Sequence, residues 1–143
     1  VTGPVPGKRI LDEKIARSII PMMETVVTQE GTALRAAVPG YRIAGKTGTA
    51  HKAEAGGYAS NAYMSLFVGM APASAPRVVT AVIIDNPRQG GYYGGLAAAP
   101  VFSRMMSDTL RLMNIEPDRS AERLAEQHRF PHPSTWARPG REG

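Results

Sequence analysis

The alternation of apolar and polar positions predicts a helix, three strands and a second helix, in that order. Residues 11–29 have apolar side chains at helical spacing, and Asp12 is a suitable N-cap. Pro21 lies inside this segment and removes one backbone hydrogen bond, so we predict a single kinked helix. Its apolar stripe consists of Ile15, Ile19, Met22, Met23, Val26 and Val27.

Three strands are predicted at residues 41–50, 62–71 and 77–85. A polar hairpin connection, residues 51–61, joins the first two, and the proline-containing turn 72–76 joins the last two. Such short connections make consecutive strands antiparallel neighbours. The third strand is almost continuously apolar, which predicts burial on both of its faces.

The second helix is predicted at residues 96–113, after a glycine-rich loop at 86–95, with Pro100 in its first turn. Beyond it the apolar pattern fades and prolines accumulate. We therefore expect residues 1–118 to belong to one folded unit and residues 119–143 to form a polar, disordered tail.

These elements predict an α+β fold in which an antiparallel sheet is flanked by helices. The chain has 143 residues and is 43% hydrophobic, which is enough for a substantial core. Three strands and two main helices leave an open sheet edge and an uncovered face. We therefore expect a partial domain whose remaining strands and helices come from an N-terminal part.

The net charge of +5 arises in residues 1–113, which contain twelve Lys and Arg against seven Asp and Glu. A basic surplus is typical of proteins that bind anionic polymers, and also of ordinary soluble domains. The positive residues are scattered and aromatic residues do not alternate with them, so we expect no nucleic-acid partner. The chain contains no cysteine and three dispersed histidines, which predicts no metal site.

Lys46, Thr47, Gly48 and Thr49 place a cation, two hydroxyls and a glycine on the first predicted strand. Lys46 and Gly48 share one face and the threonines share the other, so only a site at the sheet edge uses both sets. There an extended peptide pairs with the backbone, Gly48 permits close approach, and the hydroxyls donate to a carboxylate. The Thr49 backbone N–H is then available as one oxyanion-hole donor. As a bare tetrapeptide, the pattern also fits an ordinary strand with a surface lysine.

Three tyrosines are further candidates for ligand binding. Tyr63 opens the second strand, and Tyr92 and Tyr93 lie in the glycine-rich loop. Two interpretations are open: an apolar wall against a ligand side chain, or packing on the sheet edge and the second helix. His51 follows the K-T-G-T segment directly, and we interpret it as a solvated residue of the hairpin.

Five segments resemble, in the same order, the class B penicillin-binding transpeptidases, and together they span roughly residues 10–118. The first carries the K-T-G-T motif, the next two are the following strands, and the last two are the loop and the helix after them. In this sequence they read YRIAGKTGTA (41–50), SLFVGMAP (65–72), VIIDNP (82–87), YYGG with APVF (92–102) and LRLMNIEPD (110–118).

The resemblance implies the penicillin-binding and serine β-lactamase-like transpeptidase fold and a peptidoglycan D,D-transpeptidase that acts in cell division. In this family a serine attacks the D-Ala-D-Ala bond of a stem peptide, an amine acceptor takes over the acyl group, and β-lactams trap the acyl-enzyme. No cofactor is required. Carried over by position, Lys46 and Thr49 are catalytic, and Thr47, Gly48 and Thr49 bind the substrate. The implied partners are the rest of the domain and membrane proteins of the division complex, at the periplasmic face of the inner membrane.

The sequence departs from the family pattern in one respect. No serine has a lysine three positions later, and no Ser-x-Asn is present, so the nucleophile and the second motif are expected outside these residues. A serine β-lactamase or D,D-carboxypeptidase of the same superfamily is the near alternative, and a non-catalytic basic binding module is the distant one.

Overall fold

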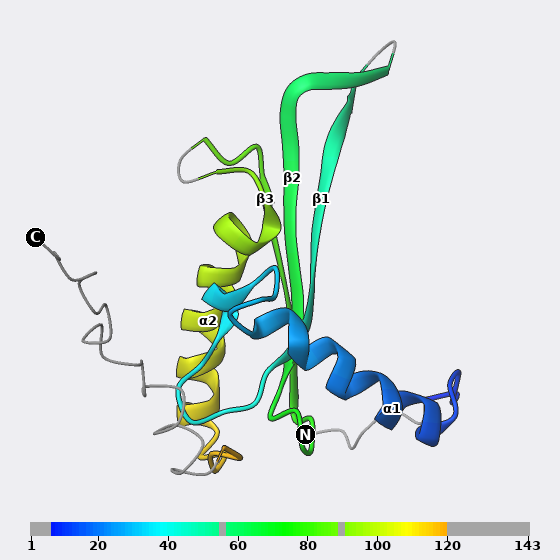
Figure 1. Ribbon diagram of the computed structural model, residues 1–143, viewed down its shortest axis with the longest axis vertical. Coiled ribbons are helices and arrows are strands. Elements are labelled where there is room, and N and C mark those ends of the chain that lie inside the picture. The colour runs from blue at the N-terminus through cyan, green and yellow to red at the C-terminus, as the bar shows by residue number, and fades with distance from the viewer. Residues whose placement is uncertain (1–6, 55–56, 89–90, 120–143) are drawn as a thin grey trace, which may run out of the picture.

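The computed structural model describes residues 7–54, 57–88 and 91–119. The predicted order of helix, three strands and helix is confirmed, with two short 3-10 turns between the first helix and the sheet (Figure 1). The predicted tail lies outside the described residues apart from Arg119. The elements are α1 (Glu13–Glu24), η1 (Thr25–Val27), η2 (Leu34–Ala36), β1 (Ala44–Glu54), β2 (Gly57–Ala71), β3 (Val78–Asp85) and α2 (Gly94–Leu112).

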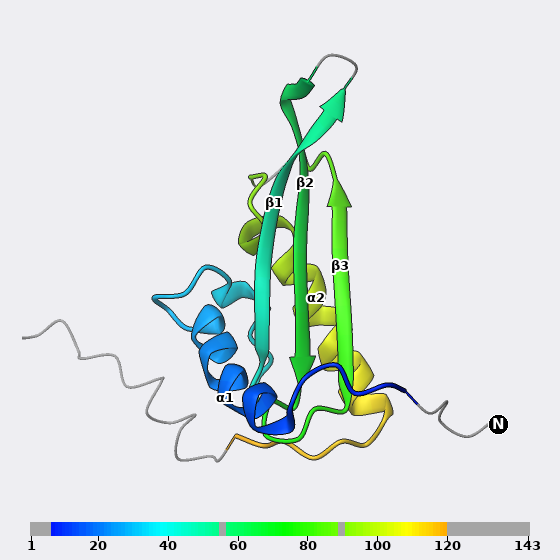
Figure 2. The same ribbon diagram turned by 90° about the vertical axis from the view of Figure 1, so that its right-hand side faces the viewer.

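The three strands form one antiparallel sheet in the order β1-β2-β3, so β1 is an edge strand of the described sheet. Figure 2 shows α2 behind the sheet and α1 beside the lower part of β1. Thr47 pairs with Phe67, and Phe67 pairs with Val82. Because Phe67 and Val82 are buried, this face of the sheet is the one that packs on α2. The predicted α+β fold with an antiparallel sheet is confirmed.

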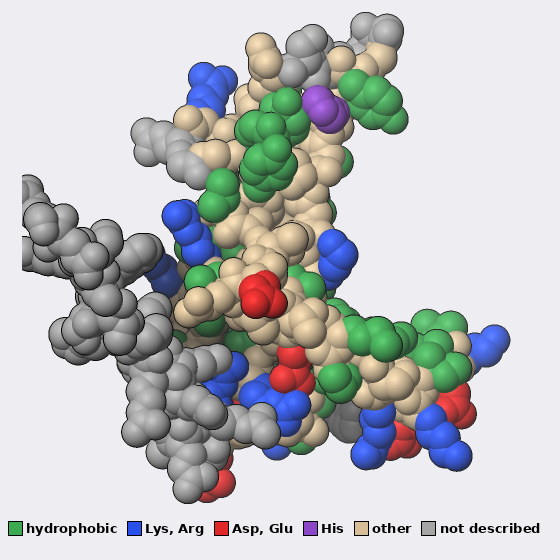
Figure 3. All heavy atoms as spheres, viewed as in Figure 1, with side chains coloured by type: hydrophobic (Ala, Val, Ile, Leu, Met, Phe, Trp, Pro, Cys, Tyr) green, Lys and Arg blue, Asp and Glu red, His purple; other side chains and the backbone are tan. Residues whose placement is uncertain are grey.

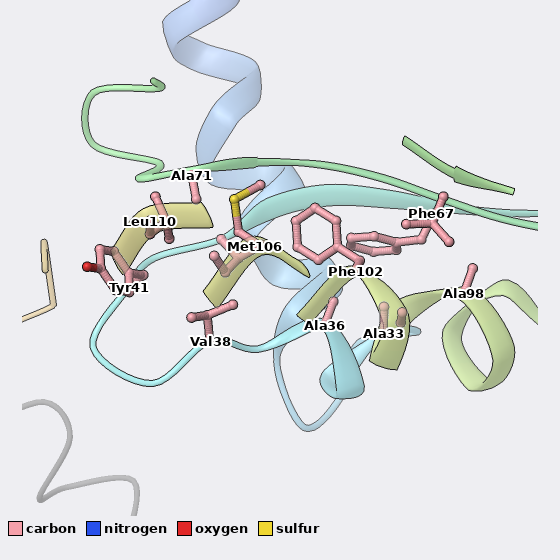
Figure 4. Packing of buried hydrophobic residues seen from close by; sticks show 13 residues of the cluster. Ala33, Ala36, Val38, Tyr41, Phe67, Ala71, Ala98, Phe102, Met106 and Leu110 are labelled. Carbon is pink, nitrogen blue, oxygen red and sulfur yellow. The ribbon is translucent and has the colours of Figure 1, made fainter. Parts of the chain in front are cut away.

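The core lies between this face of the sheet and α2 (Figure 4). The Phe67 and Phe102 rings meet edge to face, with centroids 4.7 Å apart, and Met106 and Leu110 are fully buried further along the helix. Edge-to-face pairs of this kind are favourable beyond the apolar area that they bury. Small residues at Ala33, Ala36, Ala98 and Ala99 bring η2 close to the start of α2.

The connection between β1 and β2 differs from the prediction. Residues 51–61 were expected to form a loop, but β1 continues to Glu54 and β2 begins at Gly57, with a bulge in the register between His51 and Ala53. The two strands rise past the end of β3 as a two-stranded arm (Figure 1). Polar residues predicted a loop here, yet an arm with both faces open to solvent carries polar residues without penalty.

The predicted burial of β3 on both faces is wrong. Its residues alternate between covered and exposed, with Val82 buried while Val79 is 67% and Ile83 is 58% exposed. The reason is that α2 covers only one face of the sheet. In the described residues, the apolar side chains of the other face of β3 remain on the surface.

The ends of both helices also differ from the predicted ones. α1 continues through Pro21 as one helix but stops at Glu24, and residues 25–27 form a 3-10 turn. Asp12 is confirmed as its N-cap, because its carboxylate accepts a hydrogen bond from Lys14 N. α2 begins at Gly94, two residues before the predicted start. Pro100 therefore lies in the second turn of α2 and not in the first, so that prediction is wrong.

The start of β1 is held by charged side chains from distant parts of the chain. Asp118, after α2, accepts hydrogen bonds from Arg42 N at 2.7 Å and from Ser74 N and Oγ at 3.1 and 2.7 Å. Glu24, at the end of α1, forms an ion pair with the Arg42 guanidinium at 2.7 Å. The hydrogen bond to Glu24 raises the pKa of Arg42, although desolvation opposes this shift. These contacts hold Arg42, two residues before β1 begins at Ala44 and four residues before Lys46.

Candidate active site

The K-T-G-T segment lies on β1, the edge strand, and its lysine is open to solvent. The Lys46 side chain is exposed and Nζ donates to the backbone oxygen of Thr47 at 3.0 Å. Lys46 pairs across the sheet with Val68, which is 41% exposed, and so lies on the face opposite α2. In the part of the chain that the structure describes, packing leaves this ammonium group available to a ligand.

The two threonine hydroxyls lie on the other face, and each has a polar neighbour behind it. Thr49 Oγ1 accepts a hydrogen bond from Gly94 N, the first residue of α2, at 3.1 Å. Thr47 Oγ1 lies 3.1 Å from Thr32 Oγ1 in the loop between η1 and η2. A hydroxyl that accepts from one neighbour keeps its own proton for another partner. Neither Thr32 nor Gly94 was identified from the sequence as part of the site.

The space available for a side chain differs between Gly48 and Gly94. A Cβ on Gly94 would lie 2.2 Å from Leu66 O and 2.6 Å from Gly48 O, so α2 begins directly against the backbone of β1 and β2. A Cβ on Gly48 would meet Leu66 at 3.4 Å or more, an ordinary contact. Packing within the described chain therefore requires glycine at position 94 and tolerates a side chain at position 48.

Three tyrosines and one histidine form an aromatic cluster at the end of the site. Tyr63 and Tyr92 stack with ring centroids 4.0 Å apart and an interplanar angle of 13°, Tyr92 contacts Tyr93 at 4.4 Å, and His51 contacts Tyr63 at 4.6 Å. Figure 3 shows hydrophobic side chains gathered beside the histidine at this end of the molecule. The sequence left open whether these tyrosines line a ligand or pack on the sheet edge and the second helix. In the structure their rings pack largely against one another.

Hydrogen bonds join the cluster to the strand. Ser65, which pairs with Thr49 across the sheet, donates from Oγ to the backbone oxygen of Tyr92. The Tyr92 hydroxyl donates to that of Tyr93 at 3.1 Å, and this bond is the main reason that the pKa of Tyr92 is raised. The loop that carries Tyr92 and Tyr93 is therefore positioned relative to Thr49 by the chain itself.

His51 and Lys52 lie at the base of the two-stranded arm. His51 was expected in a solvated hairpin connection, but it lies on β1 against the ring of Tyr63. Lys52 reaches across β2 to form an ion pair with Asp85 at 2.7 Å. Among the described residues, no group of three or more His, Asp or Glu side chains is placed to hold a metal ion. Neither described helix is long and apolar enough to cross a bilayer.

Comparison with known proteins assigns the family. Residues 1–107 match the family described as the penicillin binding protein transpeptidase domain. The chain belongs to this family. The resemblance seen in the sequence is therefore confirmed, and the K-T-G-T strand, β2, β3 and the first part of α2 lie inside the matched region.

This transpeptidase-family chain has close relatives among curated proteins. It is 50% identical over 125 residues to the probable peptidoglycan D,D-transpeptidase PbpC of Pseudomonas aeruginosa, covering 87% of the chain and 22% of the relative. It is 49% identical over 118 residues to the peptidoglycan D,D-transpeptidase FtsI of Escherichia coli K12, covering 82% of the chain and 20% of the relative. The chain thus spans about a fifth of the length of these relatives.

A solved structure agrees with the fold. The apo TP domain of penicillin-binding protein 3 from Burkholderia pseudomallei matches with a TM-score of 0.73 at 46% sequence identity, over 80% of this chain and 34% of that one. At this identity the two chains share the sheet-and-helix arrangement described above. In the transpeptidase-family chain, that arrangement places all four K-T-G-T residues on β1, the edge strand of the described sheet. Lys46 and Thr49 are exposed, and Thr47 and Gly48 are half-buried.

Proposed function

We propose that this chain supplies the substrate-binding strand of a peptidoglycan D,D-transpeptidase, and that the attacking serine comes from a part of the domain outside these residues. The observation that carries the proposal is the K-T-G-T segment on the edge strand β1, with Lys46 exposed and both threonine hydroxyls backed by polar neighbours. The names of the relatives support the reaction class. None of the serines in the chain has a lysine three positions later.

The edge strand accounts for substrate binding. A D-Ala-D-Ala end in extended conformation pairs with the backbone of β1, as a strand added to the sheet. The Thr47 and Thr49 hydroxyls donate to its terminal carboxylate, since charge-assisted hydrogen bonds of this kind are short and strong. Lys46 adds positive potential beside the carboxylate, and the absence of a side chain on Gly48 leaves room for the peptide backbone.

The chemistry is acyl transfer through a covalent intermediate. The serine oxygen bonds to the carbonyl carbon of the penultimate D-Ala, while a general base takes up the serine proton. The amide bond breaks and D-Ala leaves after gaining a proton at its nitrogen. An amine of a neighbouring stem peptide then attacks the ester, loses a proton and releases the serine. The Thr49 backbone N–H and that of the serine stabilise the oxyanion in both steps, and Lys46 helps to keep the serine ready for proton transfer.

The aromatic cluster forms one wall of the site. Tyr63, Tyr92 and Tyr93 present a stacked apolar surface adjoining Thr49, which suits the side chain of a stem peptide or of a β-lactam. The hydrogen bond from Ser65 to the Tyr92 backbone holds this wall against the strand. The wall contributes to binding and not to proton transfer.

The cellular setting follows from the same assignment. We place the enzyme at the periplasmic face of the inner membrane, anchored by a helix outside this chain, where it cross-links septal peptidoglycan together with membrane proteins of the division complex. Residues 1–118 then form the C-terminal part of the transpeptidase domain. β-Lactams act on it by occupying the donor site and forming the acyl-enzyme.

Labelling with a fluorescent penicillin tests the proposal. Mass spectrometry should find no adduct on this chain alone and one adduct on a serine of the remaining polypeptide when the whole domain is present. Lys46→Ala should abolish labelling in the whole domain, whereas Lys52→Ala, whose ammonium pairs with Asp85, should leave it within about twofold because exposed pairs contribute little. Labelling of the Lys46→Ala protein at the normal rate would contradict the role of Lys46. Rapid release of hydrolysed drug would identify a β-lactamase instead.

A further inference from the structure

Thr32 lies beside the site although no motif marks it. Its Oγ1 is 3.1 Å from Thr47 Oγ1, and either hydroxyl is able to donate. Building on the proposed function, we propose that Thr32 is a positioning residue that turns the Thr47 hydroxyl proton toward the carboxylate of the substrate. Thr32 touches Thr47 and acts through it.

The backbone around Thr32 is held tightly. Ala33 is buried and its N–H donates to Val26 O at 2.8 Å. A Cβ on Gly95, in the first turn of α2, would lie 1.8 Å from Thr32 O, so the helix packs directly against this peptide group. The contact fixes the main chain at Thr32 between η1 and α2. The packed backbone places the exposed Thr32 side chain within hydrogen-bond distance of Thr47 Oγ1.

Counting protons gives the direction of the hydrogen bond when a ligand is present. Each threonine hydroxyl has one proton to donate and two lone pairs that accept. A carboxylate only accepts, so the proton of Thr47 must turn to the carboxylate. The 3.1 Å contact is then kept only if Thr32 donates to Thr47. The result is a chain of donors from Thr32 to Thr47 to the carboxylate, in which each hydrogen bond strengthens the next.

Thr49 shows the same arrangement with a different donor. Its Oγ1 accepts from the backbone N–H of Gly94, which cannot change direction, and its own proton remains for the ligand. Both hydroxyls of the K-T-G-T segment are thus supported from the α2 side by one donor each. At Thr49 the donor is a main-chain amide, and at Thr47 it is the side chain of Thr32, which a single substitution removes.

The test measures acylation rate constants of the full-length protein with benzylpenicillin, whose carboxylate is free, and with its methyl ester. Thr32→Val keeps the shape and removes the hydroxyl, and it should slow acylation by benzylpenicillin about three- to tenfold, as expected for one hydrogen bond. Thr32→Ser should restore the rate. Reaction with the ester should change less than about twofold in Thr32→Val, because no charged acceptor is present. Thr109→Val is the matched control, since its hydroxyl donates to Met105 O within α2, and it should leave both rates unchanged.

A double-mutant cycle separates positioning from a structural effect. If Thr32 acts through Thr47, the protein with Thr32→Val and Thr47→Val should be no slower than Thr47→Val alone. Equal rates for wild type and Thr32→Val, equal slowing with benzylpenicillin and its ester, or additive effects in the cycle would each overturn the inference. If the wild-type protein forms no acyl-enzyme, or if Thr47→Val has no effect on acylation by benzylpenicillin, the proposed function fails first.

Discussion

At the scale of single residues, the site depends on how each polar side chain is supported. Gly94 N donates to the Thr49 hydroxyl, and the Thr32 hydroxyl lies beside that of Thr47. Lys46 extends from the other face of the strand, and among the described residues its Nζ donates to the backbone oxygen of Thr47. For the proposed carboxylate ligand, hydroxyls that are oriented in advance would lower the cost of ordering them on binding. The exposed lysine would stay free to follow the charge of that ligand.

A pH titration tests the hydrogen bond inside the aromatic cluster. The hydroxyl of Tyr92 donates to Tyr93, and this bond raises the pKa of Tyr92 above its ordinary value of about 10. The neutral phenol is favoured, so the bond is fully present at neutral pH and is lost as the pH rises through the raised pKa. Tyr93→Phe should return the pKa of Tyr92 toward its ordinary value, as followed by NMR of ¹³Cζ-labelled tyrosine. Tyr58→Phe, an exposed residue on the arm, is the control. An unchanged Tyr92 titration in Tyr93→Phe would contradict this contact.

At the scale of elements, the first residue of α2 and the middle of β1 are packed backbone to backbone. Gly94 leaves no room for a Cβ against Leu66 O and Gly48 O, and its N–H bonds to Thr49. The start of α2 thus packs against one face of the K-T-G-T strand, at the same residues whose free edge is proposed to pair with the peptide. The aromatic loop enters α2 at this same point, which couples the tyrosine wall to the strand.

Gly94→Ala should therefore destabilise the fold and impair the site together. The new methyl group would force the start of α2 away from β1, at a cost of about 1–3 kcal/mol or more for an overpacked position. Urea unfolding measures the loss of stability, and acylation by penicillin measures the effect on the site. Gly7→Ala is the control, because nothing lies within 4 Å of a Cβ there. Unfolding free energies that agree for the two variants would show that this contact is looser than described.

The sequence was sufficient to predict which elements form, but not which distant residues contact the threonines of the K-T-G-T segment. Alternating apolar residues and the K-T-G-T segment marked the strands, and both features depend on local patterns that a sequence displays. Thr32 and Gly94 belong to the site only because the loop after η1 and the start of α2 fold against β1, and no periodic pattern records such long-range contacts. The apolar run of β3 predicted burial on both faces because a sequence does not show which face is covered.

At the scale of the whole molecule, the sheet is covered unequally. α2 buries one face, whereas Val68, Val79 and Ile83 are exposed on the other. α1 adds further apolar residues next to this face, since Leu11 and Ile19 line a pocket together with Met70 of β2. The exposed members on α1 and just before it are Leu11, Ile15, Ile19 and Met22. A soluble monomer rarely exposes so many together without consequence for association.

The chain produced alone should therefore self-associate through this face. Replacing Val79 and Ile83 by threonine keeps their β-branched shape and strand preference while adding polarity, and should lower the apparent mass measured by light scattering at high protein concentration. Leu112→Ser is the control, because Leu112 is 83% exposed at the end of α2, away from this face, and single exposed apolar residues are ordinary. A monomeric wild-type chain, or an equal effect of Leu112→Ser, would argue against association through the open face.

The different lengths of the strands have a mechanical consequence. β2 pairs with β3 only over Met64–Ala71, whereas it pairs with β1 as far as Gly57. The outer part of the hairpin is thus paired on one side only, and it joins the three-stranded sheet at Met64. The Lys52–Asp85 ion pair links it to the end of β3. A two-stranded ribbon bends and opens far more readily than a three-stranded sheet. His51 and Tyr63 lie at this junction, so bending of the hairpin would first change the contact between their rings.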